Sequence, residues 1–148
     1  MTMTHSVKSK SPLRIFLSYA ASDRIDANKL RDLLSRRPNV RVFTTEMLSA
    51  GEDWKSKLKD ELSKCDVFWV LLSPNSVDSK WVLQELGAAW AIEKPIIPVV
   101  THPELISKIP VALSRHQFIN VKDIDKPEII NRVLAPYEDD LATLDNGG

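Results

Sequence analysis

Short apolar runs alternate along this chain with segments in which apolar residues recur at helical spacing. The runs have the length and composition of buried strands and fall at residues 14–19, 40–43, 67–72, 96–100 and 117–120. The other segments predict helices from the Ser22–Asp23 cap to Pro38, from Trp54 to Lys64, from Ser79 to Lys94 and from Lys126 to Ala135. This alternation predicts an α/β domain, with an open, mostly parallel five-stranded sheet and helices on both faces.

Two features refine the order of the strands. Residues 67–72 are apolar at every position, which is typical of a central parallel strand covered by helices on each side. Pro95 and Pro98 lack an amide hydrogen, and their places before and within the run 96–100 favour the start of a strand or an edge position.

In a sheet of this kind, ligands bind beyond the carboxyl ends of the strands, at the point where the strand order reverses. The loops at that edge are residues 20–23, 44–53 and 73–79. The last of these loops leads into a helix that carries Trp81 and Glu85 one turn apart on one face. No lysine or arginine lies three or four residues from Glu85, so the usual ion pair of a surface glutamate is missing. Glu85 is therefore a candidate functional carboxylate, with a solvated and unpaired surface residue as the alternative.

Composition bounds the class of protein. With 148 residues, 43% of them hydrophobic, the chain has the size of one domain with a proper core. We expect a disordered segment over residues 1–12, the domain over 13–136 and an acidic, frayed tail over 137–148. The 20 basic and 20 acidic residues cancel, which argues against nucleic acid or an anionic membrane as a partner. There is no signal-peptide pattern, and no apolar run is long enough to cross a bilayer, so a cytoplasmic location is expected.

Several kinds of site are excluded by residue type and placement. Glycines stand only at positions 51, 87, 147 and 148, and they form neither a Gly-x-Gly-x-x-Gly turn nor a P-loop. A phosphoacceptor receiver domain would need an acidic pair after the first strand and an aspartate ending the third, where this chain has Tyr19 and Ser73. The lone Cys65 begins an apolar run and is expected to be a buried thiol. No metal and no cofactor are expected, because the three histidines are isolated: His5, His102 and His116.

Four segments together resemble the Toll/interleukin receptor (TIR) family, in particular its prokaryotic, NAD-cleaving type. Residues 14–23 are similar to the family's opening strand and its Ser-Tyr-x-x-x-Asp turn, and residues 49–54 to its Gly-Glu-x-Trp loop. Residues 65–76 and the helix with Ser79, Trp81 and Glu85 complete a match over about residues 13–120. The resemblance implies a flavodoxin-like fold and cleavage of NAD+ between nicotinamide and ribose, with Glu85 as the catalytic carboxylate.

The resemblance also implies candidates for the substrate site. Tyr19 and Trp81 are expected to stack on rings or to wall the pocket, with Trp54 as a further wall, although both tryptophans could equally serve core packing. The small residues Ser18 and Ala20 would let a ligand approach the end of the first strand. Three acids are expected to cap helices before any ligand role: Asp23, and Asp53 or Glu52.

A single glutamate suffices for the implied chemistry. Departure of nicotinamide leaves an oxocarbenium-like ribose, which a fixed carboxylate stabilises, and nicotinamide leaves as a neutral molecule that needs no acid. NAD+ is thus a substrate and not a cofactor, and capture by water or by the adenine ring gives ADP-ribose or a cyclic isomer. The alternative is a non-catalytic TIR module that acts by homotypic docking.

The resemblance implies partners as well. Prokaryotic relatives suggest a role in anti-phage defence, with a sensor or effector protein as a possible partner. Self-association is expected through residues 44–53, a loop in which this chain departs from the family. Thr44 stands where many relatives have an aspartate, and Ser49 or Ala50 stands in place of a proline.

Overall fold

The computed structural model describes residues 11–48, 51, 53–109 and 118–147, and of residues 139–147 the backbone alone. Its five strands form one parallel sheet in the order β2–β1–β3–β4–β5. The strands are β1 (Leu13–Ser18), β2 (Val40–Phe43), β3 (Val67–Leu72), β4 (Ile96–Val100) and β5 (Ile119–Asn120). The predicted flavodoxin-like α/β fold is therefore confirmed, and its strand order reverses between β1 and β3.

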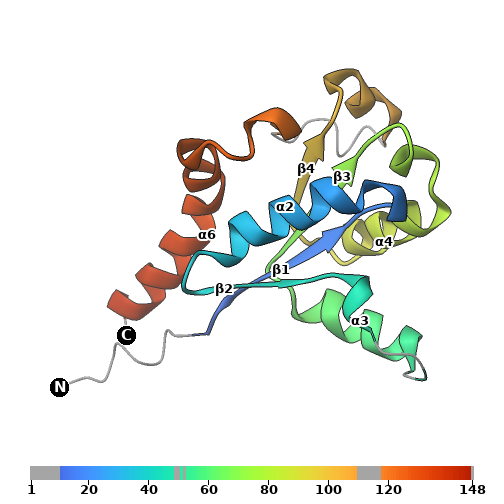
Figure 1. Ribbon diagram of the computed structural model, residues 1–148. Coiled ribbons are helices and arrows are strands. Elements are labelled where there is room, and N and C mark those ends of the chain that lie inside the picture. Colours follow the sequence, from blue (N-terminus) through green and yellow to red (C-terminus); the bar gives the residue numbers. More distant parts are fainter. Residues whose placement is uncertain (1–10, 49–50, 52, 110–117, 148) are drawn as a thin grey trace.

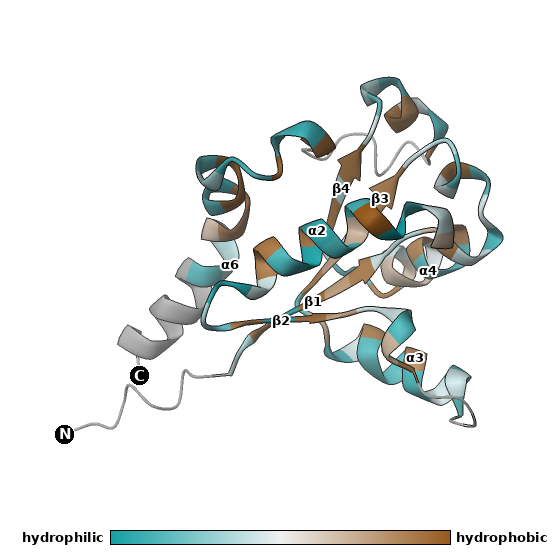
Figure 2. Cartoon of the chain, viewed as in Figure 1, coloured by the Kyte–Doolittle hydropathy of each residue, from teal (hydrophilic) through white to brown (hydrophobic). Residues whose placement is uncertain are grey.

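Helices cover both faces of the sheet. They are α2 (Arg24–Ser35), α3 (Trp54–Lys64), α4 (Lys80–Ala91) and α6 (Pro127–Gly147). One face packs against α2 and α6, and the other against α3 and α4 (Figure 1). Short 3-10 turns connect these elements: η1 (Ala21–Asp23), η2 (Thr45–Met47), η3 (Ser76–Asp78), η4 (Pro103–Lys108) and η5 (Val121–Asp123). In Figure 2 the strands are the most uniformly hydrophobic elements, whereas the helices have mixed surfaces.

The two sides of the core follow from strand geometry, in which neighbouring side chains point to opposite faces. Ile15 and Leu17 of β1 pack on the α2 side, and Phe16 packs on the α3–α4 side. Every residue of β3 is buried, as predicted for a central strand. The buried thiol is confirmed too: Cys65 is 4% exposed, its Sγ–H donates to the Leu62 carbonyl at 3.2 Å, and burial raises its pKa to about 11.

The expected edge position of the run 96–100 is wrong, because β4 lies between β3 and β5. The Pro95 carbonyl accepts a bond from β3, and the Thr101 amide donates one to β3. The backbone amides and carbonyls of odd-numbered residues in this strand therefore point toward β3, and the backbone nitrogen of Pro98 points toward β5. On that side β5 begins at Ile119, opposite Val99. The missing amide hydrogen of Pro98 therefore interrupts no bond to β3, which is how an internal strand tolerates a proline.

The C-terminal helix is longer than predicted. α6 continues beyond Ala135 to Gly147, through Pro136, which cannot donate a bond to the preceding turn. Arg37 fastens the helix to the end of α2 by two bonds to the Glu138 carboxylate, at 2.9 and 3.0 Å. No helix in the described residues is long and apolar enough to cross a membrane. The predictions for residues 1–10, Glu52, His116 and Gln117 lie outside the described residues.

Candidate active site

Glu85 is buried inside the domain. The residue is only 2% exposed, and its Oε1 accepts a hydrogen bond of 2.5 Å from Ser18 Oγ. The second oxygen, Oε2, is equally buried and has no hydrogen-bond partner among the described residues. The solvated surface glutamate that the sequence left open as an alternative is therefore wrong.

The two elements that carry this pair meet at the point where the strand order reverses. Ser18 is the last residue of β1 and points to the α3–α4 side, because it alternates with Tyr19 along the strand. Helix α4 is capped by Ser79, whose hydroxyl accepts a bond from the Val82 amide at 3.3 Å. Glu85 lies on the buried stripe of that helix, one turn after Val82, and so faces the sheet.

Burial sets the protonation of Glu85. Removal of the carboxylate from water raises its pKa to about 7, and the hydrogen bond from Ser18 lowers it by a smaller amount. A carboxyl group with this pKa is divided between its charged and neutral forms at neutral pH. Strong perturbation of an acid beside a cavity is one mark of a functional site.

A cavity of about 460 Å³ lies between α3 and α4 and is lined by Glu85, Trp54 and Trp81. The two indole rings contact one another, with centroids 5.4 Å apart and planes inclined by 60°. Trp54 is 44% exposed, so this lining residue is partly open to solvent. The remaining lining residues come from the same two helices: Lys55, Leu58, Lys59, Leu62, Gln84 and Ala88. The volume suits a nucleoside-sized ligand.

Not all of the predicted site residues reach this cavity. Tyr19 packs on the α2 side of the sheet, and its hydroxyl donates to Glu46, which also pairs with Arg24 at 2.8 Å. Burial, followed by the bond to Glu46, raises the pKa of Tyr19 to about 12. Ala20 lies on the α3–α4 side as a buried core residue and does not line the cavity. Ser18 touches the site only through Glu85.

The capping predictions have different outcomes. Asp53 caps α3 as expected, since its carboxylate accepts bonds from the Ser56 amide at 3.3 Å and the Ser56 hydroxyl at 2.9 Å. Asp23 stands at the cap position of α2, but its carboxylate bonds no amide there. It accepts a 2.5 Å bond from Ser73 Oγ instead, and thereby joins the loops after β1 and β3.

The lining lysines and Gln84 were not predicted. Lys55 and Lys59 follow Trp54 at one and five residues along α3, which is not the spacing of residues on one helix face, so the position of Trp54 did not identify them. Within the described part of the chain, no group of three histidine, cysteine or acidic side chains is arranged to hold a metal ion.

Solved structures with the same fold include several TIR domains. The TIR domain of the Toll-related receptor TRR-2 from Hydra magnipapillata has a TM-score of 0.66 and 18% identity, over 86% of this chain and 97% of that one. The TIR domains of the activated Roq1 resistosome, which directly recognises the pathogen effector XopQ, have a TM-score of 0.57 and 20% identity, over 90% of this chain and 84% of that one. A metazoan TIR-STING receptor from C. gigas has a TM-score of 0.62 and 23% identity, over 74% of this chain and 38% of that one.

Sequence comparison gives the family. No curated protein matches the chain. A family model described as TIR domain matches residues 15–134, which is most of the length of the chain and includes Ser18, Trp54, Trp81 and Glu85. This chain therefore belongs to the TIR domain family.

Proposed function

We propose that this TIR domain cleaves NAD+ between nicotinamide and ribose, with Glu85 as the catalytic carboxylate. The observation that supports this most strongly is the buried Oε2 of Glu85, which lines the cavity and has no partner among the described residues. Leaving a buried carboxylate oxygen unbonded costs folding free energy, on the order of 1–3 kcal/mol. A ligand that bonds this oxygen would offset the cost.

The chemistry needs one carboxylate and little else. The bond between the nicotinamide nitrogen and ribose C1′ breaks with its electron pair moving to the pyridinium nitrogen, so nicotinamide leaves neutral. The positive charge that develops on the ribose is stabilised by the Glu85 carboxylate. Water then adds to C1′ and releases a proton, giving ADP-ribose, or an adenine nitrogen adds and gives a cyclic isomer.

The pKa of Glu85 fits a cationic ligand. Near pH 7 the empty site holds the charged and neutral forms of the carboxyl group together, because burial raises the pKa to about 7. A bound pyridinium ring would bring a positive charge close to the carboxylate and so favour its ionised form. The substrate itself would thereby help to ionise the group that cleaves it.

The two tryptophans are placed to hold the rings of such a ligand. Trp54 and Trp81 line the same cavity as Glu85, and their rings contact one another at a tilt of 60°. Aromatic walls bind flat rings and exclude water from the reacting carbon. Tyr19 has no part in this proposal, because it lies on the other face of the sheet.

One further observation favours a docking role beside catalysis. The outward side of α4 carries Leu83 and Trp90, which are 39% and 55% exposed, and the buried Glu85 is the only acid in that helix. Apolar side chains left in water on a helix are typical of a surface that binds another protein. Homotypic docking, through this helix and through the predicted loop 44–53, is the alternative function.

Nicotinamide release tests the enzymatic proposal. Concentrated protein is incubated with NAD+, and nicotinamide and ribosyl products are followed by proton NMR. Glu85→Ala should abolish release, whereas Glu93→Ala, which removes an exposed glutamate just beyond the same helix, should leave the rate unchanged. Equal loss in both variants, or no release by the wild-type protein at any concentration, would leave docking as the function.

Self-association is tested separately by light scattering. Met47 lies in the predicted loop and is 57% exposed, so Met47→Glu places a charge on that surface at little cost to the core. A lower mass for this variant than for the wild type is the expected result. A wild-type protein that is monomeric yet active would overturn the role of the loop.

A further inference from the structure

The charged residues of α3 divide between two faces of the helix. Those that do not line the cavity form ion pairs four residues apart: Lys57 with Glu61 at 3.5 Å, and Lys64 with Asp60 at 2.8 Å. The face toward α4 carries Trp54, Leu58 and Leu62, with two further lysines between them, and all of these line the cavity. The two lysines that line the cavity, Lys55 and Lys59, are thus distinct from the two lysines of α3 that form ion pairs.

Lys55 and Lys59 lack the ion pairs that the other two lysines of α3 form. Neither forms a salt bridge with any residue in the described ranges. Asp53, the described carboxylate nearest in sequence to Lys55, is held by Ser56 at the helix cap, and Asp60, which follows Lys59, pairs with Lys64. Lys55 and Lys59 are also four residues apart, where two like charges repel one another and weaken a helix. The repulsion is relieved when an anion binds between the two ammonium groups.

The two walls of the cavity therefore carry side chains of opposite charge. On the α4 wall stands the buried Glu85 with its unbonded Oε2, and on the α3 wall stand the two lysines. A ligand that matches this arrangement carries a cationic or charge-developing ring beside the carboxylate and a strong anion within a few bonds of it. A mononucleotide end joined through a diphosphate has this pattern.

We infer that Lys55 and Lys59 bind the diphosphate of a dinucleotide whose ribose lies at Glu85. This assignment rests on the proposed function for the ring and ribose, and adds the group by which the site selects its substrate. Lysine side chains bind phosphate oxygens as mobile point charges, and two of them on one wall hold both phosphates. The site then prefers dinucleotides to nicotinamide riboside, which lacks phosphate.

Binding measurements test the inference without relying on turnover. ADP-ribose is titrated into the wild-type chain and into Lys55→Ala/Lys59→Ala by calorimetry, with nicotinamide riboside as the phosphate-free probe. The double variant should bind ADP-ribose about 10–100-fold more weakly, from the loss of two charge-assisted contacts, and nicotinamide riboside equally well. The wild-type affinity for ADP-ribose should also fall as salt rises, with a weaker salt dependence in the variant.

Two further variants separate local binding from net charge and folding. Lys57→Ala/Lys64→Ala removes the same charge from positions of α3 that do not line the cavity, and it should keep ADP-ribose affinity within about threefold of the wild type. Lys55→Arg/Lys59→Arg keeps the charge and should restore binding. Equal losses in the two alanine pairs, undiminished binding in Lys55→Ala/Lys59→Ala, or a wild-type chain that does not bind ADP-ribose would overturn the inference. Binding of ADP-ribose without nicotinamide release would support the lysines while refuting the proposed reaction.

Discussion

Ser18 and Glu85 join the end of β1 to the middle of α4 through a 2.5 Å hydrogen bond between two buried side chains. The bond fixes one carboxylate oxygen and leaves the other buried without a partner among the described residues, in a residue that lines the cavity. Burial favours the neutral form of Glu85 against the smaller effect of the Ser18 bond, while the proposed reaction requires the charged form. Stability and function therefore place opposite demands on one side chain.

Glu85→Gln should stabilise the domain at high pH. The folded-state pKa of about 7 lies above the ordinary value of 4.5, so the native state binds more protons than the unfolded state between these values. Native stability therefore falls as pH rises from about 4.5 to 7, by roughly 2–4 kcal/mol in total. A glutamine avoids this loss. Urea unfolding at pH 8.5 should show a higher free energy of unfolding for the variant, and unfolding at pH 5 a much smaller difference.

The exposed Glu104 provides a matched control for that experiment. Glu104→Gln removes the same charge, but from an exposed carboxylate. Its effect on the free energy of unfolding should therefore stay within about 0.5 kcal/mol at both pH values. If Glu85→Gln were equally stable at pH 5 and pH 8.5 relative to wild type, burial would not control the protonation of Glu85.

Ser18→Ala should move the pH dependence of nicotinamide release. The serine hydroxyl donates to the charged carboxylate and lowers its pKa, so its removal raises the pKa further. A lost charge-assisted bond corresponds to about 1–2 pKa units. The acid limb of the kcat profile should shift to higher pH by that amount, with activity recovering in alkaline buffer. Ser18→Thr retains a hydroxyl and should keep the limb near its original place, and an unshifted profile in Ser18→Ala would contradict the positioning role.

The sheet could be predicted because its pattern is local. Residues 67–72 have no polar position, and only a strand covered on both faces can bury such a run. Glu85 could be selected from the sequence because no lysine or arginine lies three or four residues from it, where an ion-pair partner on the same helix would be. Its partner could not be found this way, since Ser18 lies 67 positions away and meets it only through the packing of α4 on β1.

The errors have physical causes as well. Tyr19 directly follows Ser18, the last residue of β1, and packs on the opposite side of the sheet from the cavity, as the alternation of side chains along extended backbone requires. Asp23 has the sequence position of a helix cap, but a nearby hydroxyl from Ser73 competes successfully for its carboxylate. Pro98 lies in an internal strand because its missing donor faces away from β3. Each outcome depends on tertiary neighbours.

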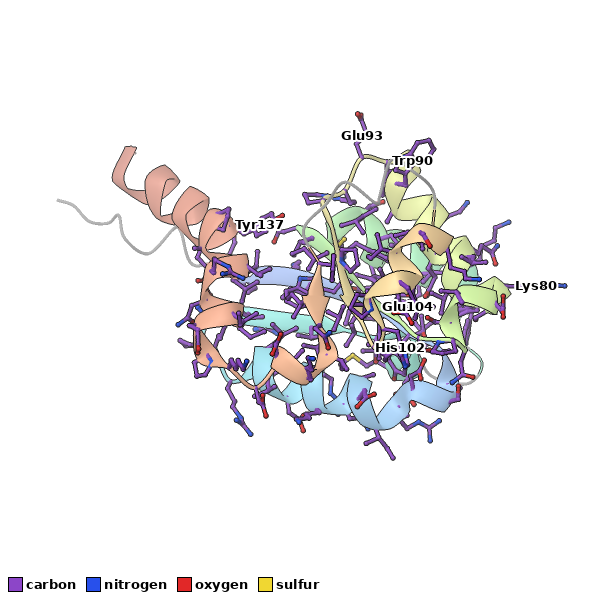
Figure 3. The ribbon with its side chains drawn as sticks, turned by 90° about the horizontal axis from the view of Figure 1, so that it is seen from above. Lys80, Trp90, Glu93, His102, Glu104 and Tyr137 are labelled. Carbon is purple, nitrogen blue, oxygen red and sulfur yellow. The ribbon has the colours of Figure 1, made fainter. Side chains whose placement is uncertain are left out.

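Trp54→Ala should weaken substrate binding with little effect on stability. Trp54 is 44% exposed and lines the cavity against Trp81, so its ring should contribute more to a bound ligand than to the core. Loss of one stacking partner should raise KM for NAD+ about tenfold, while kcat changes less. Trp54→Phe keeps an aromatic face, so its KM should lie between those of the wild type and Trp54→Ala. Trp90→Ala, near the C-terminal end of α4, should leave KM unchanged (Figure 3). A KM for Trp54→Ala equal to that of the wild type would exclude the stacking role.

The end of α4 provides a prediction that is independent of function. Glu93 follows the helix with a φ of 61°, in the left-handed region, and its side chain points away from the body of the molecule (Figure 3). The Lys94 amide bonds the Ala89 carbonyl at 3.0 Å and the Glu93 amide bonds the Trp90 carbonyl at 3.0 Å, which is the Schellman arrangement. Glycine is the residue usually found at the position of Glu93.

Glu93→Gly should therefore raise the free energy of unfolding by about 0.5–1 kcal/mol. Relief of the left-handed strain, about 1–2 kcal/mol for a residue with a Cβ, exceeds the extra freedom that glycine gives the unfolded chain. Glu93→Ala removes the carboxylate but keeps the Cβ, so it should show no such gain. Chemical denaturation of the three proteins at one pH distinguishes these effects. If alanine stabilised the domain as much as glycine, the gain would come from the lost charge and not from the backbone conformation.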